Sequence, residues 1–187
     1  MIISRGSGQK SRERIHAFVD GAYVRLGLRS IGRPDEFDPY ALVRGLVGSF
    51  ELVRVNYYDA LDEQSTTPEQ KAEYSRLTGY FDWVSGLRDT HVFLGRVRRS
   101  KSREQKGVDV QLAVDALRTA YSGAFDAILL LSGDADFEPL VTAIREAGPR
   151  IHVAAFETSV SAELRRAADR FLQLEPSGGG SFNFRAE

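Results

Sequence analysis

The chain contains no cysteine, and this absence among 187 residues excludes disulfide bonds, thiolate metal sites and cysteine nucleophiles. It also has no stretch that approaches the roughly 20 apolar residues of a membrane-spanning helix. The first residues, MIISRGSGQKSRER, are basic but include no apolar run long enough for a signal peptide. We therefore expect a cytoplasmic protein without a membrane partner.

The chain also lacks an excess of charge of either sign. Its 25 Lys and Arg residues nearly balance 26 Asp and Glu residues, for a formal net charge of −1. A basic field over the whole surface is thus excluded, and any contact with nucleic acid must be local. The apolar share of 42% and the charged share of 27% are typical of a globular protein, and the length suits one domain with a substantial core.

Composition divides the chain into three parts. Residues 1–13 are polar and charged, and residues 176–187, PSGGGSFNFRAE, are rich in glycine and serine. We expect both ends to be flexible and the domain to occupy residues 14–175.

Strand and helix patterns alternate within this domain. Short apolar runs predict strands at Ile15–Asp20, Glu51–Tyr58, His91–Val97, Ala127–Leu131 and Ile151–Phe156, with an edge strand at Phe171–Leu174. Helical periodicity with start and stop signals predicts helices at Asp38–Val47, Pro68–Leu87, Val108–Tyr121, Phe137–Ala147 and Val160–Ala168. This alternation predicts βαβ units and an α/β fold with a parallel sheet.

Acidic residues follow two of the predicted strands. Asp134 and Asp136 come shortly after the run Ala127–Leu131, and Asp20 ends the first strand. Open α/β sheets bind ligands at the carboxyl ends of their strands, so these side chains would converge if the two strands are neighbours. Asp109 lies in the first turn of a predicted helix, and the pattern alone does not place it at the same edge.

Each of these acids also has a structural explanation. Asp20 and Asp136 precede helices and could serve as N-caps, and Asp109 could complement a helix dipole. Asp134 has no such role if Asp136 is the cap. Carboxylates brought close together would raise one another's pKa, a repulsion that a hard divalent cation relieves. Oxygen ligands favour Mg²⁺ or Mn²⁺, and the three histidines show no zinc-ligand spacing.

Three sequence blocks resemble the signatures of the NYN domain, in the LabA-like branch of the PIN-like metal-dependent ribonuclease superfamily. The blocks are FVDGAY at Phe18–Tyr23, KGVDVQLAVDAL at Lys106–Leu117 and SGDADFEPLV at Ser132–Val141. The resemblance extends from about Arg14 to Leu174. It implies a Rossmann-like three-layer α/β/α sandwich with a mainly parallel sheet.

The resemblance also implies an activity, the Mg²⁺- or Mn²⁺-dependent hydrolysis of RNA by an activated water. The catalytic and metal-binding positions that it implies are Asp20, Asp109, Asp134 and Asp136. Ser132 matches the family's small hydroxyl position. Asp115 lies about 120° around the helix from Asp109, so we expect it behind the metal ligands or on the surface. Tyr23 replaces an Asn that many members carry, which bears on activity.

A basic segment directly precedes the second block. Residues 96–106 hold six basic residues and one acid, six minus one, or a net charge of +5. Such a segment could bind the phosphates of single-stranded RNA, or it could be a solvated surface loop. The candidate RNA contacts are Arg96, Arg98, Arg99, Lys101, Arg103 and Lys106, with Tyr23 as a residue that could stack on a base.

Two other functions fit parts of the pattern. A haloacid-dehalogenase-like phosphatase needs a nucleophilic Asp two residues before Asp20, where this chain has Phe18. The second alternative function is a non-catalytic RNA-binding or interaction module of the same fold. The sequence favours a ribonuclease over this module and leaves a homo-oligomer open.

Overall fold

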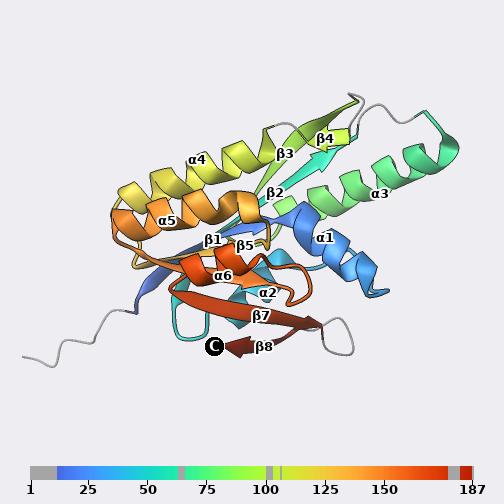
Figure 1. Ribbon diagram of the computed structural model, residues 1–187. Coiled ribbons are helices and arrows are strands. Elements are labelled where there is room, and N and C mark those ends of the chain that lie inside the picture. Colours follow the sequence, from blue (N-terminus) through green and yellow to red (C-terminus); the bar gives the residue numbers. More distant parts are fainter. Residues whose placement is uncertain (1–11, 63–65, 100–102, 106, 177–181, 187) are drawn as a thin grey trace, which may run out of the picture.

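A single eight-stranded sheet forms the centre of the computed structural model, which describes residues 12–62, 66–99, 103–105, 107–176 and 182–186 (Figure 1). The strands lie in the order β4-β3-β2-β1-β5-β6-β7-β8. Neighbours are parallel except for the outermost pairs, β3–β4 and β7–β8. The strands are β1 Arg14–Asp20, β2 Glu51–Leu61, β3 Thr90–Arg99, β4 Arg103–Gln105, β5 Ala127–Leu131, β6 Arg150–Ala155, β7 Arg170–Pro176 and β8 Phe182–Ala186.

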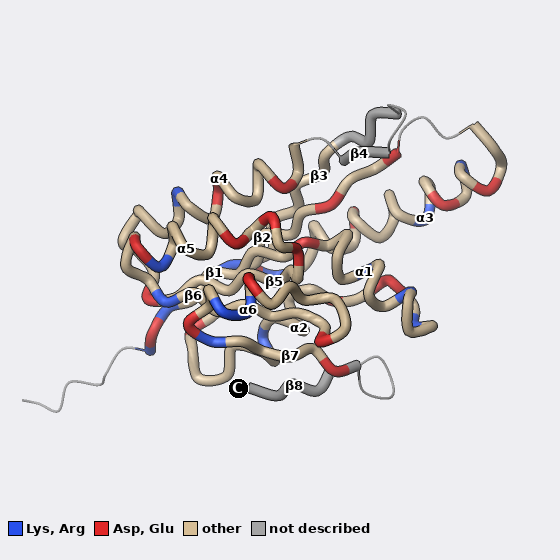
Figure 2. The backbone as a smooth tube through the Cα atoms, in the orientation of Figure 1, with Lys and Arg blue, Asp and Glu red and all other residues tan. Residues whose placement is uncertain are grey.

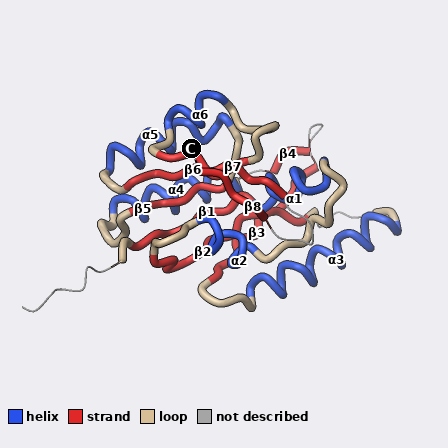
Figure 3. Tube along the Cα trace, turned by 90° about the horizontal axis from the view of Figure 1, so that it is seen from below, coloured by secondary structure: helices blue, strands red, loops and turns tan. Residues whose placement is uncertain are grey.

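Helices cover both faces of the sheet and complete a three-layer sandwich (Figure 3). The described helices are α1 Gly21–Ser30, α2 Pro39–Leu46, α3 Pro68–Ser85, α4 Val108–Tyr121, α5 Glu138–Ala147 and α6 Ala162–Ala167, with a 3-10 turn at Ala135–Phe137. One core cluster packs α1, α2 and α3 against one face, and a second packs α4, α5 and α6 against the other. The predicted α/β sandwich with a mainly parallel sheet is confirmed.

Local sequence explains where several elements begin. All five residues of β5, AILLL, are buried, as expected for a strand covered on both faces. Helix α3 starts with a capping box, in which Thr67 accepts from the Gln70 N–H and the Gln70 side chain bonds back. Pro68, the first residue of α3, fits there because that position needs no hydrogen-bonded N–H.

The strand order creates a crevice between β1 and β5. From β1 the chain continues to β2 and β3 on one side, whereas β5, β6 and β7 extend on the other. Such a switch point is where open α/β sheets bind their ligands, outside the carboxyl ends of the strands. Residues Ile15–Val19 of β1 pair with β5, so the end of β1 lies beside the loop that follows β5.

Two expectations from the sequence differ from the structure. The segment Phe171–Leu174 was expected at the sheet edge, but β7 lies between β6 and β8. Residues Phe182–Ala186 form β8, antiparallel to β7, where the Gly/Ser-rich composition predicted a flexible tail. Both differences arise from one long-range pairing that composition does not reveal. None of the helices in the described ranges is long and apolar enough to cross a membrane.

Candidate active site

Asp20 is the most constrained acid at the carboxyl edge of the sheet. It ends β1 and caps α1, with Oδ1 accepting the Tyr23 N–H at 2.9 Å. Its second oxygen, Oδ2, accepts from the Ser132 hydroxyl at 3.0 Å. The carboxyl group therefore has a fixed orientation between the end of β1 and the loop after β5.

Ser132 links this carboxyl group to the loop that carries the next acids. The same hydroxyl oxygen that donates to Asp20 accepts the Asp134 N–H at 3.3 Å. Asp134 in turn accepts the Asp136 N–H through Oδ1 at 3.0 Å, and it caps the 3-10 turn. Asp134 is thus the cap, not Asp136 as the sequence suggested, because the turn begins one residue after Asp134. Both side chains are exposed.

Burial and neighbouring acids raise the pKa of two carboxyl groups at this edge, Asp20 and Asp109. Burial raises the pKa of Asp20 to about 7, against the two hydrogen bonds, and the charges of Asp109 and Asp59 add to the rise. Burial also raises the pKa of Asp109, and the charges of Asp134 and Asp136 raise it further. Asp109, in the first turn of α4, therefore lies at the same edge of the sheet as the other three. Figure 2 shows acidic segments where β1 enters α1 and where β5 leads to α5.

The donor set suits a hard divalent cation. Within the described ranges, no three His, Cys, Asp or Glu side chains are arranged so that they could hold a metal ion. Mg²⁺, however, usually takes only one or two carboxylates and keeps several waters. Asp20 and Asp134, which are linked through the Ser132 hydroxyl, offer oxygen ligands of this kind. A cation would offset the burial of the Asp20 charge, which is the main cause of its raised pKa, and the smaller repulsion from Asp109 and Asp59.

Tyr23 holds a second loop against this edge. Its hydroxyl accepts the Phe156 N–H at 3.0 Å and is hydrogen bonded to Ser159 Oγ at 2.8 Å. The Ser161 N–H also donates to the Gly133 carbonyl at 3.1 Å. A Cβ on Gly133 would lie 2.5 Å from the Tyr23 hydroxyl and 2.6 Å from the Ser159 carbonyl, so only glycine fits between them. Tyr23 was expected to stack on a base. In the structure its hydroxyl holds the loop that follows β6.

Asp59 is an acid near the site that the sequence patterns did not identify. It lies in β2, is fully buried, and contributes to the raised pKa of Asp20. Arg25 of α1 binds both of its oxygens, at 2.8 and 3.1 Å, and Tyr57 donates to it at 2.9 Å. These partners satisfy Asp59, which makes it a structural support. Asp59 directly follows the predicted strand Glu51–Tyr58, but β2 continues to Leu61, so the side chain lies inside the strand and is buried.

The remaining candidate residues lie elsewhere. Asp115 accepts from Tyr58 at 3.0 Å and from Gln111 at 2.8 Å, on the β2 side of α4 and not among the four acids. In the basic segment, Arg98 and Arg99 lie in β3, where the backbone register places them opposite Glu104 and Arg103 of β4. Arg96 lies in β3 as well. Lys101 and Lys106 fall outside the described residues.

Comparisons with known proteins agree with this arrangement. The family model of the NYN domain matches residues 14–175. The Low amplitude and bright protein LabA of Synechococcus elongatus is 29% identical over 164 residues, which cover 86% of this chain and 83% of that protein. MJ0482 of Methanocaldococcus jannaschii is 33% identical over 67 residues, 36% of this chain and 28% of that protein.

A solved structure supports the fold independently. The crystal structure of VPA0982, a protein of unknown function from Vibrio parahaemolyticus, matches with a TM-score of 0.66 and 23% identity. The match covers 95% of this chain and all of that one. Since the family model spans the whole α/β sandwich and its acidic edge, the chain belongs to the NYN domain family.

Proposed function

We propose that the protein is an Mg²⁺- or Mn²⁺-dependent ribonuclease that hydrolyses phosphodiester bonds of single-stranded RNA. Membership of the NYN family, which is related to PIN-like nucleases, indicates an RNA-related function. The observation that carries the finer proposal is the Asp20 carboxyl group. It is oriented by two hydrogen bonds beside the Asp134 loop, and its pKa is raised by burial and by neighbouring acids.

The acids would share the work unequally. Asp20 and Asp134 would hold the cation, since the Ser132 hydroxyl bonds to the Asp20 carboxyl group and to the Asp134 backbone N–H and so keeps the two residues side by side. Asp109 and Asp136, both exposed, would orient water molecules around it or accept a proton from the attacking water. When bound, the cation would supply a water of lowered pKa and neutralise charge on the phosphate.

The RNA would approach over the exposed side of this edge. Strands β3 and β4 carry basic residues at Arg96, Arg98, Arg99 and Arg103. They precede α4, which has Asp109 in its first turn. Contacts with phosphates need no particular base, so such a segment would bind single strands without sequence preference. This placement supports RNA as the substrate class.

The decisive experiment compares wild type with Asp134→Asn on a labelled single-stranded RNA. We expect cleavage with Mg²⁺ or Mn²⁺, no cleavage in EDTA, and at least a hundredfold slower cleavage by Asp134→Asn. Asp82→Asn, at an exposed position of α3, is the matched control and should cleave as wild type does. Equal cleavage by wild type and Asp134→Asn would trace the activity to a contaminant.

A non-catalytic RNA-binding module is the second candidate. It is favoured by the lack of a three-carboxylate group among the described residues and by Tyr23, whose hydroxyl is committed to the Phe156 loop. RNA binding that persists while neither cation produces cleavage would select this candidate.

A further inference from the structure

A cavity of about 590 Å³ lies between α4 and the neighbouring face of β1, β2 and β3. His16 and Asn56 line it from the sheet, and Arg54 and Arg118 line it as well. His16 is four residues before Asp20 on β1, a separation of about 13 Å at a rise of about 3.3 Å per residue. The cavity is therefore distinct from the acidic edge, and its volume is typical of small-molecule sites.

Two buried polar side chains in this cavity are unsatisfied. Both ring nitrogens of His16 and Oδ1 of Asn56 lack a hydrogen bond of good geometry, although the two side chains interact with each other and the residues are only 5% and 7% exposed. The Asn56 amide nitrogen donates to the Tyr58 hydroxyl at 3.2 Å, and that hydroxyl donates to Asp115 at 3.0 Å. These hydrogen bonds orient the Asn56 amide beside His16.

The histidine is neutral at physiological pH. Burial is the main cause that lowers the pKa of His16 to about 4, with the Arg54 and His91 charges also lowering it and Asn56 and Asp115 opposing. A neutral imidazole offers one N–H donor and one nitrogen acceptor. Together with the Asn56 oxygen, the cavity thus presents two acceptors and one donor.

The walls are flat and aromatic. Phe93, half-buried, stacks on Tyr58 with ring centroids 4.9 Å apart and an interplanar angle of 9°. The His16 ring stacks on Phe18 at 4.6 Å and meets the edge of Phe125 at 5.1 Å. Aromatic faces of this kind accept planar rings, including nucleobases.

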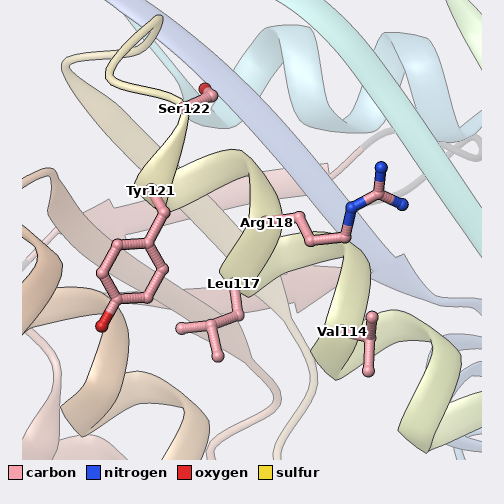
Figure 4. A pocket seen from close by; sticks show the side chains of 5 residues that line it. All are labelled: Val114, Leu117, Arg118, Tyr121 and Ser122. Carbon is pink, nitrogen blue, oxygen red and sulfur yellow. The ribbon is translucent and has the colours of Figure 1, made fainter.

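The opening of the cavity is basic. Arg54 is exposed, and the Arg118 side chain is 80% exposed, with Asp115 as an ion-pair partner at 3.9 Å. Figure 4 shows the Arg118 guanidinium extending from α4 away from the Leu117 and Tyr121 side chains, although all three residues line a second pocket. Asp115 is the one acid that lines the cavity, and it also accepts from Tyr58 and Gln111. Two arginines at an opening suit a phosphate group.

We propose that this cavity is a second ligand site that binds a nucleotide, with the base between the aromatic walls and the phosphate at Arg54 and Arg118. The excess of acceptors favours a base with an exocyclic amine, such as adenine. The His16 nitrogens are shielded by Phe18 and Phe125, so contact with them requires the partly exposed Phe125 ring to move. The nucleotide could be free or part of an RNA strand.

The test is calorimetric titration of the full chain with AMP in EDTA, which removes metal-dependent binding at the acidic edge. We expect saturable binding that is unchanged in Asp134→Asn, so a failure of the proposed nuclease would not affect it. Arg54→Ala should weaken AMP binding at least tenfold while changing adenosine binding little. Arg44→Ala, at an exposed position of α2, is the matched control and should bind as wild type does.

His16→Phe tests the cavity floor. The ring keeps its stacking partners and loses its unsatisfied nitrogens, so the variant should be folded and at least as stable while binding AMP at least tenfold more weakly. A five-nucleotide RNA titrated in EDTA shows whether the ligand is a free nucleotide or part of an RNA strand. If the protein binds this RNA but not AMP, and the same variants lose the RNA binding, the site binds an RNA strand. No saturable binding of either probe, or binding that both variants retain, would overturn the proposal and leave a water-filled cavity.

Discussion

Tyr23→Phe is the substitution that tests most directly how the acidic edge is held together. It removes only the hydroxyl, which accepts the Phe156 N–H at 3.0 Å and is hydrogen bonded to Ser159 at 2.8 Å. The Tyr23 ring would keep its contact with Phe156, whose ring centroid is 5.8 Å away. The Phe156 N–H would then lie in a buried residue without its partner.

The expected loss follows from these contacts. An unsatisfied buried donor costs about 1–3 kcal/mol, and the Ser159 hydroxyl, which is exposed, can bond to water instead. We therefore expect Tyr23→Phe to lower the free energy of unfolding by about 1–3 kcal/mol, measured by urea denaturation at pH 7. The matched control is Tyr121→Phe, at a position on α4 that is 70% exposed, which should change the stability by less than about 0.5 kcal/mol.

A second measurement locates the effect. Hydrogen exchange of the Phe156 amide should become faster in Tyr23→Phe, because its acceptor is gone. The Ser159 loop packs on Gly133, so RNA cleavage should also slow through a lower kcat with little change in KM. Unchanged stability together with unchanged exchange at Phe156 would refute the idea that this hydroxyl fixes the loop.

Two other outcomes test the packing of the fold. Burial holds the pKa of His16 and of His152 at about 4, below the unfolded value of 6.5, so the unfolded state binds more protons between those values. The free energy of unfolding should therefore fall as the pH drops from about 6.5 to about 4, by up to about 3 kcal/mol per histidine. Urea denaturation at each pH measures this loss, and His16→Phe should remove about half of it. Arg25→Ala leaves Asp59 buried without its main partner, so we expect a loss of about 3–5 kcal/mol in the same assay, larger than for the exposed control Arg44→Ala.

Local sequence patterns predicted the elements that are marked by a simple pattern of apolar residues. The limits of β5 and α4 agree with the predicted ranges, because a run of apolar residues and a helical period leave little choice. Helix α1 was expected after Asp20 but could not be delimited, since it contains Gly21 and Gly27, which usually weaken helices. A Cβ at either position would lie 2.2 Å from an aromatic ring, so these glycines allow close packing.

Long-range pairing decided what the sequence left open. That Asp20 and Asp134 are neighbours depends on β1 pairing with β5, across more than a hundred residues, and local patterns contain no information about that pairing. The same holds for β8, FNFRA, which follows the Gly/Ser-rich stretch and pairs with β7. Asp109 could be assigned to the acidic edge only through a family resemblance, and the electrostatic influence of Asp134 and Asp136 on its pKa now gives a physical reason.

The structure also bears on whether Asp20 is only a helix cap. It does cap α1, and a cap that accepts an N–H and a hydroxyl normally has a lowered pKa, because both bonds stabilise the carboxylate. Here burial and the charges of Asp109 and Asp59 outweigh those bonds and raise the pKa to about 7. A group needed only as a cap gains nothing from acidic neighbours, since their repulsion reduces the stability that the cap provides. A cation bound at the edge, as we propose, would offset both this repulsion and the cost of burying a charged carboxylate, and Asp20 would then act as a helix cap and as a metal ligand.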